Sequence, residues 1–201
     1  MLPRALNNAI EALSMLPGVG PRTAERYAYY LFKSSSKLTD NIAESLANLH
    51  DGVKSCPITF ALIDADEDIS PFYADEKRDK TTVLVVEEPL DIYAIEQTRG
   101  YKGTYHVLGG AVSPIDGITP DQLHIRELIG RVEKDKVSEV IIATNPSVEG
   151  ESTALLIEKM LHEKYPNLKL TRLARGLPLG VDLSYADQIT LSAALENRTK
   201  L

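Results

Sequence analysis

The chain has 201 residues, a formal net charge of −7 and a single cysteine, Cys56. This length is enough to bury a substantial core, as one domain or as several modules, and no run approaches the roughly 18 consecutive apolar residues of a membrane span. One cysteine excludes an internal disulfide framework and a four-thiolate metal site, so a reducing, cytoplasmic setting is expected.

Charge is unevenly distributed along the chain. Residues 1–37 hold five basic and two acidic side chains, a net charge of +3, which leaves −10 for the remainder. A protein that binds a polyanion concentrates its cations where the contact is made. If the chain binds nucleic acid, the first module is the expected contact.

The first fifty residues predict three short helices. Apolar residues recur at helical spacing over residues 6–16 and 23–32, and Thr39-Asp40 offers an N-cap for a third helix that runs to residue 49. The segment between the first two helices, Leu16-Pro17-Gly18-Val19-Gly20-Pro21-Arg22-Thr23, resembles the hairpin of a helix-hairpin-helix motif.

The hairpin residues suit a phosphate contact. Two glycines permit positive φ and let backbone N–H groups at the next helix N-terminus approach a phosphate. Arg22 lies in the first turn of that helix and Arg26 lies one turn later on the same face. We therefore predict that Gly18, Gly20, Arg22, Thr23 and Arg26 bind the DNA backbone independently of base sequence. The alternatives are an ordinary packing corner and a subunit contact.

The second predicted helix also carries Tyr27, Tyr29 and Tyr30. Their rings could stack on nucleic-acid bases. A stripe of core side chains is the favoured interpretation.

Residues 52–80 lose helical and strand periodicity and predict a small, irregular, finger-like module. Cys56, Thr59, Ser70 and Tyr73 stand where a zinc finger would place its four ligands. Structural zinc sites use four nitrogen or sulfur donors, and only Cys56 offers a soft one. Zinc binding is therefore not expected, and aromatic side chains in the segment are expected to supply a small core in its place.

From residue 81 the pattern alternates between strand and helix. The predicted strands cover residues 82–87, 104–108, 139–144 and 168–173, and the predicted helices cover 90–97, 121–133 and 151–165, with a last helix over 185–197. This alternation predicts a parallel sheet with helices on both faces. The expected fold is α/β, with a helical module (1–51), the finger-like insert (52–80), the sheet domain (81–171) and a C-terminal helical segment (172–201).

Acidic residues follow two of the predicted strands. Glu87 ends the first strand, and Glu149 and Glu151 follow the third, so all three are expected near one crevice at the carboxyl edge of the sheet. Magnesium-dependent phosphoryl transfer needs several carboxylates there, but the positions nearest the strand are Asn145 and Ser147, both neutral. A weak Mg²⁺ site stays open, and the alternative is that Glu87 and Glu151 only stabilise helix N-termini.

Seven blocks of the sequence, in order and at compatible spacing, together resemble the RecR family of bacterial recombination mediators. The blocks are Leu16-Pro17-Gly18-Val19-Gly20, Val85-Val86-Glu87, Ala94-Ile95-Glu96, Tyr105-His106-Val107-Leu108-Gly109-Gly110, Ser113-Pro114-Ile115-Asp116-Gly117, Ala143-Thr144-Asn145-Pro146-Ser147-Val148-Glu149-Gly150-Glu151 and Arg172-Leu173-Ala174-Arg175-Gly176-Leu177-Pro178. The resemblance covers nearly the whole chain.

The resemblance implies a helix-hairpin-helix, a four-cysteine zinc finger, a Toprim domain and a C-terminal segment with a Walker-B-like motif. It also implies a DNA-repair protein without catalytic activity, cytoplasmic and nucleoid-associated, which forms a tetrameric ring around single- or double-stranded DNA. Such a protein works with RecO and RecF to load RecA onto single-stranded DNA.

The resemblance assigns roles to particular residues. Arg22 and Arg26 match basic positions implicated in DNA contact, and Glu87, Glu149 and Glu151 match acids to which partner binding is attributed. The chain departs from the family at the finger, where Cys56 is the only cysteine left, so the zinc that the family implies is not expected here.

Two other functions are weighed against this one. A Mg²⁺-dependent Toprim nuclease or topoisomerase-like enzyme would need aspartate at position 145 or 147, or an activated tyrosine. Tyr93 and Tyr101 are available, but nothing in the sequence marks either as activated. A nucleotide-binding regulator is disfavoured because the chain contains no Gly-x-x-x-x-Gly-Lys-Ser/Thr loop.

Overall fold

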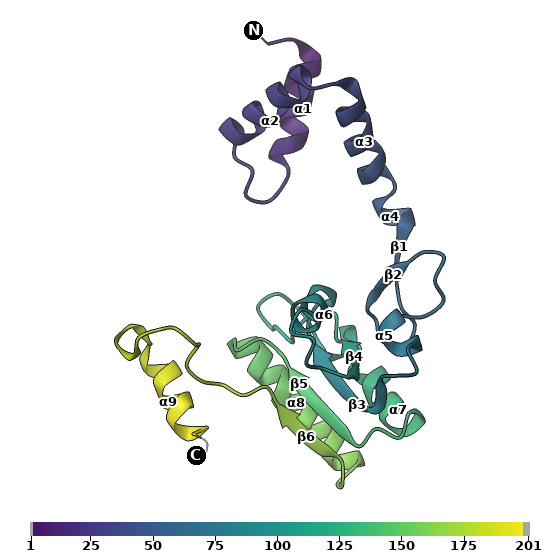
Figure 1. Ribbon diagram of the computed structural model, residues 1–201, viewed down its shortest axis with the longest axis vertical. Helices are drawn as coiled ribbons and strands as arrows, with labels where there is room; N and C mark the ends of the chain where they lie inside the picture. The colour runs from purple at the N-terminus through teal and green to yellow at the C-terminus, as the bar shows by residue number, and fades with distance from the viewer. Residues whose placement is uncertain (1, 199–201) are drawn as a thin grey trace. The chain divides into compact units, whose positions relative to one another are not determined.

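The computed structural model describes residues 2–198, and the chain divides into two compact units, Met1–Val53 and Lys54–Leu201. Figure 1 shows the order of the helices and strands.

The first unit is helical. It contains α1 (Arg4–Ser14), α2 (Pro21–Lys33), α3 (Ser36–Ala47) and the single turn α4 (Leu49–Gly52). Helix α1 packs against α2, where Ala24 and Ala28 are the buried residues of α2. The expected N-cap at Thr39-Asp40 is wrong. Helix α3 begins one turn earlier because Ser35 adopts the extended backbone of an N-cap residue.

The second unit begins with the finger-like module. Strands β1 (Val53–Ser55) and β2 (Leu62–Asp64) form a two-stranded sheet, and the short helix α5 (Pro71–Ala74) follows with Ser70 as its N-cap. The Ser70 hydroxyl accepts the N–H of Phe72 at 3.3 Å, which satisfies one of the first donors of this helix.

The expected parallel sheet is confirmed. Its strands are β3 (Asp79–Val86), β4 (Gly103–Val107), β5 (Glu139–Ala143) and β6 (Lys169–Arg172), in the order β4-β3-β5-β6, with every neighbouring pair parallel. The connecting helices are α6 (Pro89–Glu96), α7 (Ile125–Lys134) and α8 (Val148–Lys164) (Figure 1). The single helix expected over 121–133 is instead a 3-10 turn (Pro120–Gln122) followed by α7, because Leu123 between them is extended.

Both faces of the sheet are buried, as expected for parallel strands. Val83 and Val85 of β3 point into a core that α7 and α8 complete. Leu84 and Val86 point to the other face, where Ile92 of α6 covers them together with the finger-like module. Each fully buried aliphatic side chain stabilises the fold by about 1.5–3 kcal/mol.

Phe60 of the finger-like module packs against this second core and also contacts two histidines. The Phe60 ring stacks on His124 with centroids 3.6 Å apart and meets His106 edge-on at 5.4 Å. Beside it, the N–H of Val107 in β4 donates to the carbonyl of Thr59 at 2.8 Å. His106 is fully buried, and burial lowers its pKa to about 3, so this ring stays neutral at physiological pH. The module is therefore part of the sheet domain's packing.

The C-terminal segment contains a 3-10 turn (Leu183–Tyr185) and α9 (Gln188–Glu196). The last helix starts three residues later than expected, because Asp187 caps it by accepting the N–H of Thr190 at 2.9 Å. Helix α9 buries no side chain. Among residues 2–198, no helix combines the length and the apolar character needed to cross a bilayer.

The start of α8 is the tightest point at the sheet edge. The Ser147 hydroxyl accepts the N–H of Gly150 at 3.0 Å and caps the helix. A Cβ added to Gly150 would lie 2.2 Å from the carbonyl oxygen of Asn145 and 2.7 Å from the Glu87 carboxylate. Glycine is required here because the first turn of α8 lies directly against the ends of β3 and β5.

We predict that Gly150→Ala destabilises the protein by about 1–3 kcal/mol, the usual cost of forcing extra atoms into close packing. The matched control is Gly130→Ala in the interior of α7, where an added Cβ would meet no atom within 4 Å. That change should leave stability equal or raise it by up to about 1 kcal/mol, because alanine favours helix. Urea unfolding followed by circular dichroism measures both, and equal stabilities for the two variants would contradict the steric account.

Candidate functional site

Glu87 and Asn145 meet at the carboxyl edge of the sheet. Strands β3 and β5 pair up to Val86 and Ala143, so the residues that follow lie side by side. The Glu87 carboxylate accepts the backbone N–H of Asn145 at 2.8 Å and its side-chain amide at 2.5 Å. Glu87 is only 7% exposed. Its charge is satisfied inside the protein by two amide donors.

The two other predicted acids lie on the first turns of α8. Glu149 is partly exposed, and Glu151 forms ion pairs with Arg172 at 2.5 Å and with Arg175. Hydrogen bonds from Arg175 and Arg172 lower the pKa of Glu151. The expected crevice is therefore assembled, but it is less acidic than the sequence indicated. The two arginines were missed, although Arg172 ends the last strand and Arg175 follows it, at the same edge of the sheet.

The resemblance to a Toprim domain raises the question of whether this edge can bind Mg²⁺. The side chains present here do not suit that ion. Both Glu87 oxygens accept amide hydrogens, and Asn145 directs its amide nitrogen, which cannot bind a cation, towards them. Glu151 is held by two arginines. Within residues 2–198, no three or more histidine, cysteine, aspartate or glutamate side chains gather as a potential metal site.

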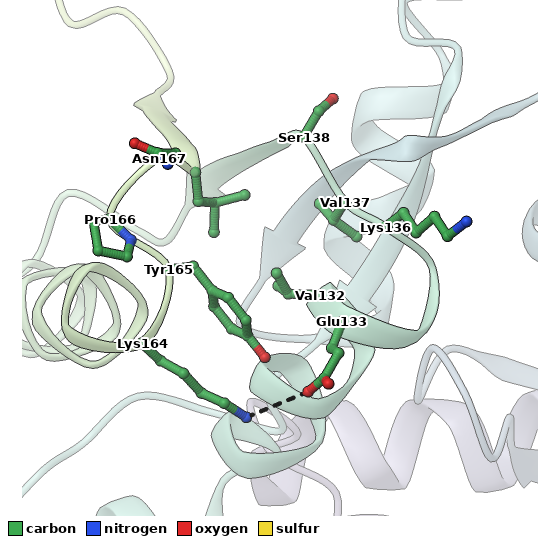
Figure 2. A pocket seen from close by; sticks show the side chains of 10 residues that line it. Val132, Glu133, Lys136, Val137, Ser138, Lys164, Tyr165, Pro166 and Asn167 are labelled. Carbon is green, nitrogen blue, oxygen red and sulfur yellow. Dashed lines mark ion pairs between the residues drawn. The ribbon is translucent and has the colours of Figure 1, made fainter.

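Two open grooves border the sheet domain. One, of about 310 Å³, lies at the start of α8 between Pro146, Val148, Ser152 and Arg175, beside the crevice. The other, of about 490 Å³, lies between the turn after α7 and the turn after α8, at the opposite edge of the sheet (Figure 2). Two of its charged residues, Lys164 and Glu133, form an ion pair at 3.8 Å.

Only one of the two glycines in the predicted phosphate-binding hairpin adopts positive φ. Gly18 has φ of +78°, a conformation that favours glycine. Gly20 is the N-cap of α2 with φ of −76°, and a Cβ there would meet no atom within 4 Å, so the fold itself does not demand glycine. Arg22 and Arg26 are exposed, and Thr23 lies in the first turn of the helix with its N–H bonded to the carbonyl of Gly20.

The tyrosines of α2 do not form the expected core stripe. Tyr27, Tyr29 and Tyr30 are all exposed, and Ala24 and Ala28 form the inner face. Small residues on that face let α1 and α2 approach closely, and the larger rings are directed outwards as a result.

The four zinc-finger positions are occupied by groups that already have partners. Cys56, Thr59 and Ser70 are fully buried, and the Cys56 sulfur accepts the N–H groups of Ile58, Thr59 and Ser70 at 3.5, 3.5 and 3.3 Å. Burial alone would raise the thiol pKa, but hydrogen bonds from the Thr59 side chain and these N–H groups outweigh it, and the pKa of Cys56 is lowered. One thiol with two hydroxyls and a phenol does not fit structural zinc.

The fourth finger position, Tyr73, anchors the module to the sheet domain. Its hydroxyl donates to Asp135 at 2.9 Å, and Asp135 also pairs with the buried Arg131 at 2.9 Å. Arg131 in turn donates to Thr104 of β4 at 2.6 Å. Sequence reasoning missed this chain of contacts, although the i, i+4 spacing of Arg131 and Asp135 is a recognisable signal for an ion pair.

Comparison with known protein families assigns most of the chain. A model described as "RecR, helix-hairpin-helix" matches residues 6–50, one described as "Toprim domain" matches residues 81–174, and one described as "RecR, C-terminal" matches residues 176–199. The expected fold class, with its helix-hairpin-helix, central Toprim sheet and C-terminal helix, is confirmed.

Several curated relatives are similar over the full length. "Recombination protein RecR" from Rhodococcus jostii is 44% identical over 98% of both chains. The protein of the same name from Thermobifida fusca is 44% identical over 100% of this chain and 99% of its own length. The one from Moorella thermoacetica is 46% identical over 99% of this chain and 98% of its own length. Because identity of this level extends from end to end, the chain belongs to the RecR family.

Proposed function

We propose that the chain is a non-enzymatic DNA-binding mediator of recombinational repair in the cytoplasm. A role in recombination is supported by the names of its full-length relatives. The structural feature that carries the proposal is the hairpin at Gly18–Gly20, which leads into α2 with Arg22 and Arg26 exposed beside it.

The hairpin supports contact with the DNA backbone. The backbone at Gly20 has a φ that any residue can adopt, so the fold does not require glycine there. Because the residue is glycine, the space before α2 is free of side-chain atoms. A phosphate can use that space to reach the positive end of the helix, and the two arginines add charge. Such contacts carry no base information, so the proposed binding is independent of sequence and weakens with salt.

The sheet edge supports a role other than catalysis. Toprim enzymes are expected to hold Mg²⁺ with carboxylates, whereas here Asn145 supplies amide donors to Glu87. Each Glu87 oxygen therefore already accepts one hydrogen bond, which makes it a weaker ligand for a cation. This favours a docking surface over the alternative, a Mg²⁺-dependent nuclease or topoisomerase-like enzyme.

Unpartnered apolar side chains support assembly into a tetrameric ring. Helix α3 buries no residue, yet Leu38, Ile42 and Leu46 recur at helical spacing along it. Helix α9 likewise exposes Ile189 and Leu195. Exposed apolar stripes of this kind mark protein contacts, and several protomers on one DNA would raise apparent affinity by avidity.

Replacing both Arg22 and Arg26 by alanine should weaken DNA binding about tenfold or more. It should also reduce the slope of log affinity against log salt by about 0.9 for each duplex phosphate that the variant no longer neutralises. Fluorescence anisotropy with a labelled duplex at several salt concentrations measures both, and light scattering of the same samples should give four protomers.

The matched control is Lys159→Ala, which removes an exposed cation on α8. Equal effects of the two changes would contradict a specific role for the hairpin, and a monomeric mass with and without DNA would contradict the ring. Nicking of supercoiled DNA in Mg²⁺ would contradict the non-enzymatic assignment.

We further propose that the chain acts with RecO and RecF to load RecA, and that Glu149 and Glu151 face a basic surface of RecO. Acidic side chains repel DNA but suit a basic protein, although Glu151 shares its charge with Arg172 and Arg175. Glu87, although part of the same prediction, is buried and bonded to Asn145, so it supports the surface from beneath.

Changing Glu149 and Glu151 together to glutamine should lower affinity for purified RecO about three- to tenfold at low salt, since each is a partly exposed charge and Glu151 lines the groove. The control Glu163→Gln removes the same charge from the other end of α8. Isothermal titration calorimetry gives both affinities, and an unchanged affinity for the double variant would rule out this role.

We also propose that the finger-like module folds without zinc, because its four positions are bonded to protein groups. Atomic emission analysis should find no stoichiometric zinc, and EDTA should leave the melting temperature unchanged. A module that needs structural zinc unfolds in chelator. One zinc per chain whose removal lowers the melting temperature would overturn the proposal.

A further inference from the structure

One face of α2 combines cations with aromatic rings. Arg22, Arg26, Tyr29 and Lys33 follow each other at spacings of four, three and four residues, which places them in a single stripe along the helix. All four are exposed, and the opposite face carries the buried alanines of the α1–α2 contact. With a rise of about 1.5 Å per residue, the stripe extends about 16 Å beyond the hairpin.

Two tyrosines lie on this face, and the exposed ring of Phe32 stacks on one of them, Tyr29, with centroids 6.4 Å apart. Tyr29 and Tyr30 are 51% and 62% exposed. Lys33 places its ammonium group 4.7 Å from the centre of the Tyr29 ring, so the cation and the ring are already adjacent. The more exposed Tyr30 lies next to Tyr29 and flanks the stripe.

We propose that this face binds single-stranded DNA, with Tyr30 and Tyr29 stacking on unpaired bases while Arg22, Arg26 and Lys33 contact the phosphates. The inference rests on the proposed DNA binding of the hairpin and extends it along α2. A cationic track beside exposed rings is the combination that holds single strands, because phosphates follow the charges and every base offers a face for stacking.

The rings distinguish single strands from duplex. In a duplex the bases are stacked on each other, so a tyrosine on a protein surface reaches them only after they have been unstacked. The arginines contact phosphate in either form. The structure therefore assigns general backbone binding to the start of α2 and preference for unpaired DNA to its second half.

A second copy of the chain is the less suitable occupant of this face. In a two-fold contact the same patch faces itself, so the three cations of the stripe would face three cations. Glu25 is the only acid on α2. The uncharged apolar stripe for self-association lies elsewhere, on α3, with Leu38, Ile42 and Leu46.

The test measures anisotropy of the full chain with a labelled oligothymidine and with a duplex of equal length. Tyr30→Ala should weaken single-strand binding about 5- to 150-fold, the effect of losing one stacked base, and should change duplex binding by less than about twofold. Tyr30→Phe should retain single-strand affinity because it keeps the ring. Tyr30→Leu should lose it although the side chain stays apolar.

Tyr93→Ala, which removes an exposed tyrosine from α6, is the matched control and should change neither affinity. Light scattering must give the same mass for the wild type and Tyr30→Ala. Equal loss on both DNAs, full affinity in Tyr30→Leu, or a smaller assembly in Tyr30→Ala would overturn the stacking role. If Arg22→Ala with Arg26→Ala leaves both affinities unchanged, the DNA-binding proposal itself fails.

Discussion

The contact between Glu87 and Asn145 determines what the carboxyl edge of the sheet can do. A carboxylate that is almost fully buried must have its charge compensated, and two amide donors from Asn145 supply that compensation. The same contact fixes the end of β5 against β3, and it leaves room for α8 only because residue 150 lacks a side chain. A site of this fold that held a cation would use the same two oxygens as ligands. Here they stabilise the protein.

In the finger-like module, packing and hydrogen bonds likewise take the place of metal coordination. Its four candidate ligand positions bond to backbone N–H groups, to each other and to Asp135. The module gains further contact through Phe60, whose ring lies flat on His124 while its backbone adopts φ of +59°. A left-handed conformation is unfavourable for phenylalanine, by about 1–2 kcal/mol. The module covers one face of the sheet through Phe60, Ala61 and Phe72.

The helical unit separates two kinds of surface. Helix α2 places cations and tyrosines on one face, whereas α3 exposes aliphatic side chains. The two kinds of surface suit different ligands, since cations attract phosphate and uncharged apolar stripes favour burial against protein. A chain that is acidic overall can bind DNA through such a unit, because the screening length at physiological salt is about 8 Å and distant acids act weakly.

The sequence alone determined the order of the elements, the parallel sheet, the hairpin before α2 and the family. These follow from local patterns, such as the period of apolar residues and the glycines of a turn, that need no knowledge of distant contacts. Only the tertiary structure decided which side chains far apart in sequence form ion pairs or hydrogen bonds with each other. It paired Glu151 with Arg172 and Arg175, buried Glu87 against Asn145, and bonded Tyr73 to Asp135. It also turned the tyrosines of α2 outwards, because the inner face of that helix is set by its contact with α1. Charge pairing and burial depend on distances between segments, and a periodic pattern along one segment does not contain them.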